Sequence, residues 1–290
     1  MRLATPRFRS ECIRAVEDGD IEDENATGAD GTCIGSGDPR AGIGVLAMDE
    51  QQRADRRVYR ATLTRIHEHH PGTHSLFLRM DARDAWTFTP GQFISCELPV
   101  LGDPALVRAY SLASSPEDAE LEICVDLIAG GPGSTHLFGL PVGAEVVFTG
   151  PFGSFVLVEP PPVPLVFVGE GTGVAPLRPM VRRALARGGT QRIVVVQGAR
   201  WDHELVYRDD FERWAAEYPN FEWDHVLLAT EAEIGPLDAL EGVVLERFVR
   251  GDDDRSRRFW ICGAGAMPGR LRDALRAAGY ERRAVRAEAW

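Results

Sequence analysis

Lysine is absent from this sequence of 290 residues, and all 32 basic residues are arginine. The absence excludes catalysis through a lysine Schiff base and phosphate binding by a lysine ammonium group. Guanidinium groups must therefore supply every cationic contact, and they bind carboxylates and phosphates through paired N–H donors. A phosphate bound by this protein is expected to lie against arginine side chains or backbone N–H groups.

Cysteine is scarce and scattered. The five cysteines form no C-x-x-C pair and no cluster with metal-ligand spacing; they are Cys12, Cys33, Cys96, Cys124 and Cys262. This pattern argues against a zinc site or an iron–sulfur cluster held by this chain, so we expect no bound metal. Reduced thiols are the default for such a pattern, which predicts a cytoplasmic protein.

Long apolar runs are missing as well. No run approaches the roughly 18 residues of a membrane-spanning helix, and the first residues lack the apolar core of a signal peptide. The net charge of −12 and the pI near 5.1 argue against nucleic acid or anionic lipid as a partner. The length and the 44% hydrophobic content predict about two domains with sizeable cores.

Three segments differ in composition. Residues 1–55 are acidic and lack periodicity, with six carboxylates in the eight residues 17–24. We predict a disordered extension there, and an arm that docks a partner is the alternative reading. The proline-rich stretch 159–164 cannot join a sheet interior and marks a boundary between domains at 56–160 and 161–290.

The segment 56–160 has the pattern of short antiparallel strands. Apolar and polar residues alternate in several stretches, namely 58–66, 73–80, 93–98, 106–112, 121–127 and 146–148. Regular spacing of such strands predicts a six-stranded antiparallel β-barrel, completed by 155–158. His67, His69 and His70 precede a Pro-Gly turn, so we interpret them as a solvated hairpin end rather than a metal site.

A glycine-rich loop at 130–133 leads into a short helix, with Ser134 or Thr135 as its expected N-cap. Free backbone N–H groups at a helix start favour an anion. An ordinary capped helix between strands is the alternative reading.

The segment 161–290 alternates between strands and helices. The runs 165–168 and 193–196 are continuously apolar, as expected for strands buried on both faces. Further strands are predicted at 221–228, 258–262 and 284–290, with helices between them. This pattern predicts a doubly wound α/β domain, whose ligands bind beyond the carboxyl ends of the strands.

Two motifs suggest ligands. Arg108-Ala109-Tyr110-Ser111 offers a guanidinium for a diphosphate, a ring for stacking and a hydroxyl, which together suit a flavin nucleotide. The turn Gly171-Thr172-Gly173 joins a buried strand to a helix that begins near Pro176. Its small residues allow close approach of a diphosphate, although a purely structural turn remains open.

In order and spacing, these motifs resemble the ferredoxin–NADP reductase superfamily. The resemblance rests on Arg108–Ser111, Gly133-Ser134, Gly171–Pro176 and Cys262–Met267, and it covers about four-fifths of the chain. The final Glu288-Ala289-Trp290 resembles the Glu-x-aromatic end of plant-type members.

The resemblance implies that the barrel binds FAD. Tyr110 would stack on the isoalloxazine ring with Ala109 beside it, Ser111 would bond near the reactive N5, and Trp290 would cover the other face of the ring. The diphosphate would be held by a further set of residues, namely Arg108, Gly133, Ser134 and Thr135.

The second domain would bind the pyridine nucleotide through Gly171, Thr172, Gly173 and Pro176. Cys262 would lie beside the nicotinamide C4, followed by Gly263 and Met267. The carboxylate of Glu288 would position the nicotinamide or relay protons.

The preferred coenzyme is predicted from Thr230-Glu231, where NADP-binding relatives often carry Ser-Arg. A carboxylate repels a 2′-phosphate and can bond a ribose diol, so we favour NADH. Arg200 keeps NADPH open as the alternative.

The implied function is hydride transfer from NAD(P)H to FAD, followed by electron release to a ferredoxin, flavodoxin, oxygenase or haem protein. Arginines 178, 182, 183 and 187 offer a docking face for that partner, and a solvated helix face is the alternative reading. The alternatives are an NAD(P)H:flavin or quinone reductase with a diffusible acceptor, and a non-catalytic electron-relay or regulatory subunit.

Overall fold

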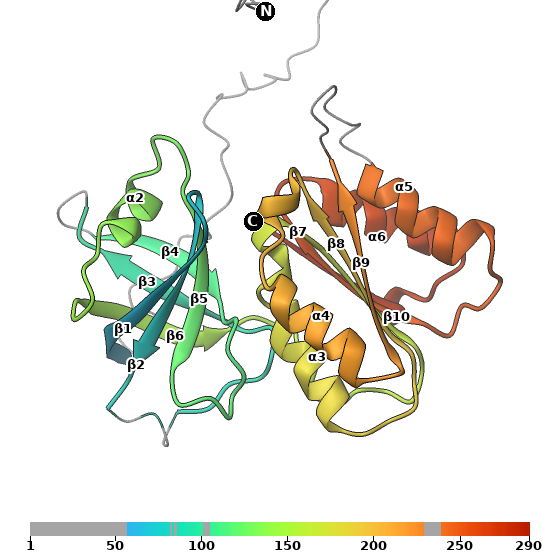
Figure 1. Ribbon diagram of the computed structural model, residues 1–290, viewed down its shortest axis with the longest axis horizontal. Helices are drawn as coiled ribbons and strands as arrows, with labels where there is room; N and C mark the ends of the chain where they lie inside the picture. The colour runs from blue at the N-terminus through green and yellow to red at the C-terminus, as the bar shows by residue number, and fades with distance from the viewer. Residues whose placement is uncertain (1–56, 82, 84–85, 101–104, 229–238) are drawn as a thin grey trace, which may run out of the picture. The chain divides into compact units, whose positions relative to one another are not determined.

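The computed structural model describes residues 57–81, 83, 86–100, 105–228 and 239–290 (Figure 1). The predicted acidic extension at 1–55 and the coenzyme-selecting pair Thr230 and Glu231 lie outside the described residues.

The first half of the described chain forms a six-stranded antiparallel sheet. Its strands are β1 (Val58–His70), β2 (Thr73–Arg79), β3 (Phe93–Leu98), β4 (Leu106–Ser111), β5 (Leu121–Asp126) and β6 (Glu145–Phe152). Their order in the sheet is β4-β3-β6-β1-β2-β5. Alternate residues point inward, so Leu63, Leu76, Ile94 and Phe148 are completely buried in one core.

The sheet curls so that its two edges meet. Leu112, directly after β4, forms an antiparallel bridge with Ile123 of β5. The N–H of Ala113 donates to the carbonyl of Glu122 at 2.8 Å. These contacts, together with the six antiparallel strands, confirm the predicted barrel architecture.

The second half forms a five-stranded parallel sheet. Its strands are β7 (Leu165–Glu170), β8 (Ile193–Ala199), β9 (Phe221–Leu227), β10 (Arg258–Gly263) and β11 (Val285–Ala289). Their order is β11-β10-β7-β8-β9, so the chain moves outward in one direction from β7 and then returns to β10 on its other side. The reversal creates a crevice beyond the carboxyl ends of β7 and β10, where α/β sheets of this kind bind ligands.

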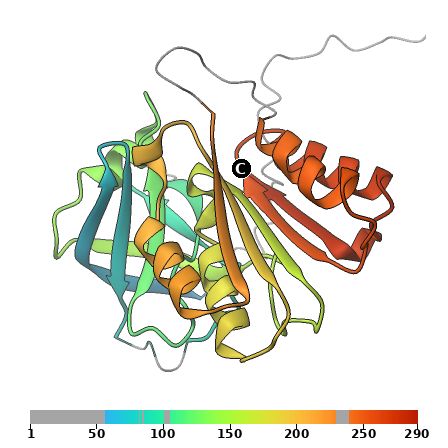
Figure 2. The ribbon, with the colours of Figure 1, turned by 45° about the vertical axis from the view of Figure 1, so that its right-hand side comes forward.

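Helices cover both faces of this sheet. They are α3 (Leu177–Ala186), α4 (Arg208–Glu217), α5 (Ala239–Leu245) and α6 (Met267–Ala277). Helices α3 and α4 cover one face and α5 and α6 the other (Figures 1 and 2). Apolar residues of α3 and α4 share one core with the sheet, and those of α5 and α6 share another. The shorter pieces are the 3₁₀ turns η2 (Gly171–Val174), η3 (Asp202–Glu204) and η5 (Arg282–Ala284) and the π-helical turn η4 (Glu246–Arg250). The doubly wound α/β prediction is confirmed.

Two local predictions are wrong. Residues 155–158 form no strand; Phe155 and Leu157 instead bury their side chains in the core shared with α3. The short helix α2 (Pro132–Phe138) begins earlier than expected, with Gly131 as its N-cap. Pro132 favours this start because its fixed φ suits the first helical position.

The interpretation of the three histidines as a solvated hairpin end fails for one of them. His69 is half-buried, its ring lies edge-on to Tyr207 at 4.8 Å, and its Nε2 is 2.9 Å from the hydroxyl of Ser75. Burial, and then the nearby charge of His67, lower the pKa of His69 to about 3. His69 is therefore neutral at pH 7.

Among the described residues, no helix is long and apolar enough to cross a membrane. The same part of the chain holds no group of three metal-ligating side chains.

Candidate functional site

The tetrapeptide Arg108–Ser111 forms the last four residues of β4 and pairs with β3. Tyr110 lies opposite Ile94 and is half-buried against the barrel core. Burial raises the pKa of Tyr110 to about 12, so its hydroxyl is protonated and the ring is uncharged. Arg108 is on the same side of the strand and is exposed.

Helix α2 approaches Arg108 closely. A Cβ on Gly133 would lie 3.1 Å from Leu98 and 3.3 Å from the Arg108 side chain. Glycine therefore allows the helix to pack beside the guanidinium arm. Among the described residues, Arg108 is bonded to the carbonyl of its own neighbour Val107 at 2.9 Å and to no carboxylate, so most of its donors suit a diphosphate.

The hydroxyl of Ser134 is engaged within the loop before α2. It accepts the N–H of Ile128 at 3.0 Å and lies 3.2 Å from the carbonyl of Gly131. Ser134 therefore fixes the shape of the loop, while the side chain of Thr135 is exposed. The loop backbone, more than these hydroxyls, is suited to meet phosphate.

The turn after β7 lies in the crevice of the parallel sheet. Gly171 has a φ of 54°, a left-handed conformation that glycine adopts at little cost. A Cβ on Gly173 would lie 2.3 Å from the carbonyl oxygen of Cys262, which is closer than atoms can approach. The turn and the end of β10 thus touch through their backbones, and Pro176 follows as the N-cap of α3.

The hydroxyl of Thr172, a residue that the prediction assigned to the coenzyme, is already bonded within the protein. It donates to the carboxylate of Asp126, at the end of barrel strand β5, at 2.7 Å. A hydroxyl has a single hydrogen, so Thr172 can offer a phosphate its backbone N–H but no side-chain donor while this bond holds.

Cys262 is fully buried at the end of β10. Its neighbours across the sheet are Gly169 on β7 and Glu288 on β11. Burial, and then the negative charge of Glu288, raise the pKa of Cys262 well above its usual value. The thiol is therefore protonated and does not act as a nucleophile. Its small, polarisable side chain would instead line the expected nicotinamide position.

The residues after Cys262 enclose the same end of the sheet. A Cβ on Gly263 would lie 2.9 Å from the terminal methyl of Met267, the buried first residue of α6. Burial raises the pKa of Glu288 to about 7. Trp290 is about half exposed, and its carbonyl accepts the N–H of Gly265 at 3.2 Å.

The structure therefore brings the predicted residues into two groups. Arg108 and Gly133 meet on the barrel, and Gly173, Cys262 and Glu288 meet at the crevice. The donors of Arg108 suit a diphosphate, and at both points the missing Cβ lets the chain pack closely against its neighbours. The prediction that Trp290 covers the flavin stays a prediction.

The four arginines on α3 and directly after it do not form a free docking face. Each contacts the barrel or the stretch that follows it: Arg178 meets Glu122, Arg182 meets Asp118, Arg183 meets the carbonyl of Leu157, and Arg187 meets Glu159. This correction has a simple cause. The helix face that the sequence shows as charged is turned toward carboxylates that lie far away in the chain.

Sequence reasoning also missed Glu122, Asp126 and Tyr207, which join the two halves of the described chain. The available signal was the pair of carboxylates, Glu122 and Asp126, in the strand sequence LEICVD.

Comparisons with known proteins agree with this geometry. Residues 60–157 match the oxidoreductase FAD-binding domain family, and residues 167–272 match the oxidoreductase NAD-binding domain family. Together the two matches confirm the predicted FAD and nicotinamide nucleotide as cofactors.

Several characterised proteins are similar along most of the chain. Ferredoxin–NADP reductase B of Sorangium cellulosum is 31% identical over 205 residues, which cover 69% of this chain and 83% of that protein. A ferredoxin–NAD(P)⁺ reductase component of naphthalene 1,2-dioxygenase/salicylate 5-hydroxylase systems from Ralstonia is 32% identical over 213 residues, covering 73% of this chain and 62% of that protein.

Solved structures show the same architecture. A cytochrome P450 reductase of Amycolatopsis superposes with a TM-score of 0.69 at 30% identity, covering 79% of this chain and 68% of that one. A ferredoxin–NADP⁺ reductase of Neisseria gonorrhoeae, solved with bound FAD and NADP, shares the fold with a TM-score of 0.67 at 19% identity, over 81% of this chain and 98% of that one.

Proposed function

Because the chain belongs to the ferredoxin–NADP reductase family, and is therefore an oxidoreductase that binds FAD and a nicotinamide nucleotide, we propose that it passes electrons from NADH to a one-electron acceptor protein. The observation that carries this proposal is the backbone contact between Gly173 and Cys262 beside Glu288. That contact places the nucleotide turn directly beside Cys262, at the carboxyl end of the sheet, where a nicotinamide ring would be held.

Each half of the site has its own task. On the barrel, Arg108 and the backbone at Gly133 hold the FAD diphosphate, while Tyr110 stacks on the ring and Ser111 donates to its edge. FAD, when bound, accepts a hydride and releases the two electrons singly. At the crevice, Gly171, Thr172 and Gly173 offer backbone N–H groups to the coenzyme diphosphate. The protonated thiol of Cys262 would keep the nicotinamide pocket small and adds no charge of its own.

Glu288 makes the reaction depend on pH. Its ionised carboxylate stabilises the positive charge that develops on the nicotinamide as hydride leaves. With a pKa of about 7, the residue gains this charge across the neutral range. We expect the rate of flavin reduction to rise between about pH 6 and about pH 8, and Glu288→Gln to flatten the profile and lower the plateau roughly 10-fold, or about 1.4 kcal/mol. Stopped-flow reduction across this range measures both effects.

Stability provides a separate check on the same residue. The raised pKa means that folded Glu288 holds its proton to a higher pH than the ordinary value of 4.5. The folded state then binds more protons than the unfolded state, so this residue lowers stability as pH rises from about 4.5 to about 7. Glu288→Gln should remove that loss in denaturant titrations. A variant with the wild-type pH profiles of both rate and stability contradicts the assignment.

We place the acceptor at a groove of about 560 Å³ along edge strand β11. Five arginines line it beside Glu288: Arg272, Arg276, Arg282, Arg283 and Arg286. Arg272 and Arg283 have carboxylate neighbours, but the other three form no ion pair among the described residues. In a chain with a net charge of −12, this local excess of positive charge suits an acidic partner.

Charge reversal tests this placement. Arg282→Glu with Arg286→Glu should lower kcat/KM for oxidised ferredoxin as acceptor by about 10- to 100-fold at low salt, because steering by opposite charges is lost. The effect should shrink as salt is added. Arg60→Glu, on the barrel strand β1, reverses one charge instead of two, and should alter the rate by far less than half as much. Equal effects of the two substitutions would remove the groove from the proposal.

The class of acceptor is inferred from relatives. The proteins similar to this chain include reductase components of dioxygenase systems and a cytochrome P450 reductase. We therefore propose a ferredoxin, flavodoxin, oxygenase or haem protein as acceptor. NADH remains the preferred donor because of Glu231, and the three free, buried cysteines in the described part of the chain support a reducing, cytoplasmic location.

The deciding experiment is an anaerobic titration of the purified, FAD-loaded protein with NADH and with NADPH, followed by cytochrome c reduction with and without added ferredoxin. Bleaching of the flavin by NADH and strong dependence on ferredoxin are the expected results.

A second candidate, quinone reduction, is favoured by a 33% identity over 181 residues to a Na⁺-translocating NADH-quinone reductase subunit of Neisseria meningitidis. Rapid quinone reduction without ferredoxin supports it. Bound FAD that NADH does not reduce points to a non-catalytic subunit.

A further inference from the structure

Barrel strand β5 presents three side chains to the nucleotide-binding half. Residues two apart on a strand share a face, so Glu122, Cys124 and Asp126 point the same way. Cys124 belongs to the same core as Leu177 of α3 and Phe167 of β7. The other two side chains are carboxylates, and each forms hydrogen bonds to the nucleotide-binding half.

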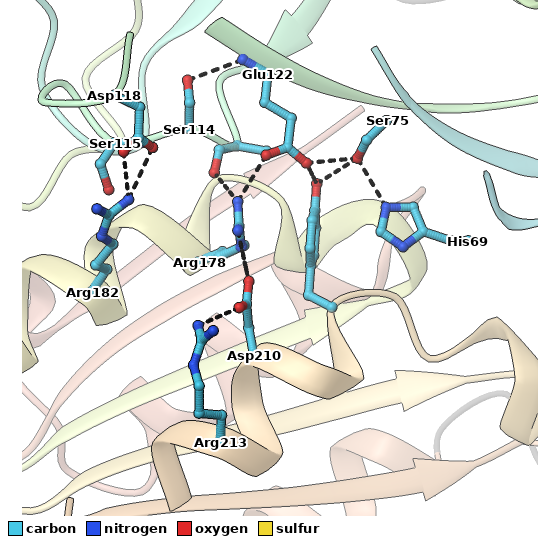
Figure 3. A network of polar contacts seen from close by, with 12 residues as sticks. His69, Ser75, Ser114, Ser115, Asp118, Glu122, Arg178, Arg182, Asp210 and Arg213 are labelled. Carbon is cyan, nitrogen blue, oxygen red and sulfur yellow. Dashed lines mark hydrogen bonds and ion pairs between the residues drawn. The ribbon is translucent and has the colours of Figure 1, made fainter. Parts of the chain in front are cut away.

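Glu122 is buried and accepts hydrogen bonds from both halves (Figure 3). Ser75 of β2 donates at 2.7 Å and Tyr207 at 2.9 Å to one of its oxygens. Arg178 of α3 donates to the other oxygen at 2.9 Å. The carboxylate is thus satisfied by one barrel residue and two residues of the nucleotide-binding half.

Arg178 connects this carboxylate to the next helix. Its Nε donates to Asp210 of α4 at 2.7 Å, and its guanidinium also reaches the carbonyl of Ala113 at 3.0 Å. The same guanidinium lies 4.6 Å from the centre of the Tyr207 ring. Arg178 therefore holds α3, α4 and the barrel together at one point.

Tyr207 adopts a strained backbone conformation to reach this position. Its φ is 61°, which is uncommon for a residue with a bulky side chain. The ring is nearly fully buried, between the guanidinium of Arg178 and the imidazole of His69. Strain of this kind persists only where surrounding contacts compensate for it.

Asp126 forms a second attachment, four residues along the same strand. One oxygen accepts the hydroxyl of Thr73 at 2.5 Å, and the other accepts the hydroxyl of Thr172 at 2.7 Å. Thr172 belongs to the nucleotide-binding turn itself. At a rise of about 3.3 Å per residue, the two carboxylates are attached to β5 at points about 13 Å apart.

We propose that β5 aligns the nucleotide-binding turn on the barrel, with Glu122 and Asp126 as positioning residues for hydride transfer. The proposal rests on the proposed function, because it concerns the distance between coenzyme and flavin. Glu122 is bonded to Arg178 of α3, and Asp126 is bonded to Thr172 of the turn before it, so the two carboxylates together hold this turn and the start of the helix against β5. Neither carboxylate belongs to the residues assigned to cofactor binding. Buried carboxylates are poor sources of stability, and fixing one arrangement of packed parts is a role for which they are better suited.

The test compares Glu122→Gln and Asp126→Asn, which keep the shape of each side chain and remove its charge. In single-turnover reduction of the FAD-loaded protein, we expect the rate constant to fall by about 10- to 100-fold, as when reacting atoms are displaced by about 1 Å. The dissociation constant for NADH should change much less, because the turn keeps its own shape. Bound FAD should stay at the wild-type level.

Hydrogen exchange provides a readout that does not depend on activity. In the purified full-length variants, without NADH, the amides of η2 and of the first turn of α3 should exchange about 10-fold faster than in the wild type, because their attachment to β5 is weakened. Tyr207→Phe removes only one hydroxyl from the network. It is the milder variant to use if Glu122→Gln does not fold.

Arg182→Gln is the matched control. Arg182 lies on the same helix and also pairs with the barrel, at 2.7 Å from Asp118, but its side chain is half exposed. An exposed pair contributes little, so both readouts should stay at wild-type values. The proposal is overturned if the carboxylate variants match the wild type in exchange and reduction, or if Arg182→Gln has equal effects. If NADH does not reduce the wild-type flavin, the proposed function fails, and exchange alone decides whether β5 holds the turn.

Discussion

Gly173→Ala is expected to reduce hydride transfer by about 100-fold or more while FAD remains bound to the barrel. The added methyl group would lie 2.3 Å from the carbonyl oxygen of Cys262 and 2.7 Å from its carbonyl carbon. Both atoms belong to β10, which is hydrogen-bonded on each side to β7 and β11 and cannot give way alone. The turn must move instead, and overpacking of this kind also costs about 1 to 3 kcal/mol of stability.

Stopped-flow reduction by NADH, together with the visible spectrum of the bound flavin, measures this effect. Gly269→Ala is the matched control, since a Cβ at this position of α6 meets nothing within 4 Å. Alanine is the better helix former, so the control should be as active as the wild type and slightly more stable. A Gly173→Ala protein that reduces its flavin at the wild-type rate would show that the crevice does not hold the nicotinamide.

Tyr110→Ala is expected to weaken FAD binding by about 10- to 100-fold. Stacking of a base on an aromatic side chain contributes about 1 to 3 kcal/mol, and alanine offers no ring. Tyr110→Phe keeps the ring and should retain nearly all affinity, because the phenol is protonated, with a pKa raised to about 12, and contributes no charge.

Titration of flavin-free protein with FAD, followed by quenching of flavin fluorescence, gives the two dissociation constants. Thermal unfolding of both variants separates lost stacking from a damaged barrel, since Tyr110 also packs against the barrel core. If Tyr110→Ala binds FAD as tightly as Tyr110→Phe, the stacking role belongs to another residue.

The order of the strands and helices could be predicted from the sequence, because the spacing of apolar residues along a segment shows which of its side chains are buried. β3 alternates between buried and half-buried residues, as a strand with one inward face must. Every residue of β8 is buried, as in a strand covered by helices on both sides. The turn Gly171–Gly173 was also recognisable, because close backbone approach requires glycine.

Other features had no local signal. Residues 155–158 are as apolar as a strand, but they pack under α3 without pairing, and apolar content alone does not distinguish these outcomes. The arginines of α3 have the spacing of a solvated helix face. Only the packed structure shows that Arg178 meets Glu122, 56 residues earlier in the chain, and Asp210, 32 residues later.

By itself the sequence determined the two architectures and the strand-to-helix turn after β7, because periodicity and glycine placement are properties of neighbouring residues. The flavin site at Arg108–Ser111 is a prediction from the order of its motifs. The tertiary structure alone decided how these parts are joined. It assigned the hydroxyl of Thr172 to Asp126, turned the α3 arginines toward the barrel, and buried Glu122 between the two halves. The physical reason is that a buried carboxylate must find its donors wherever the fold brings them, and those donors lie as much as 85 residues away.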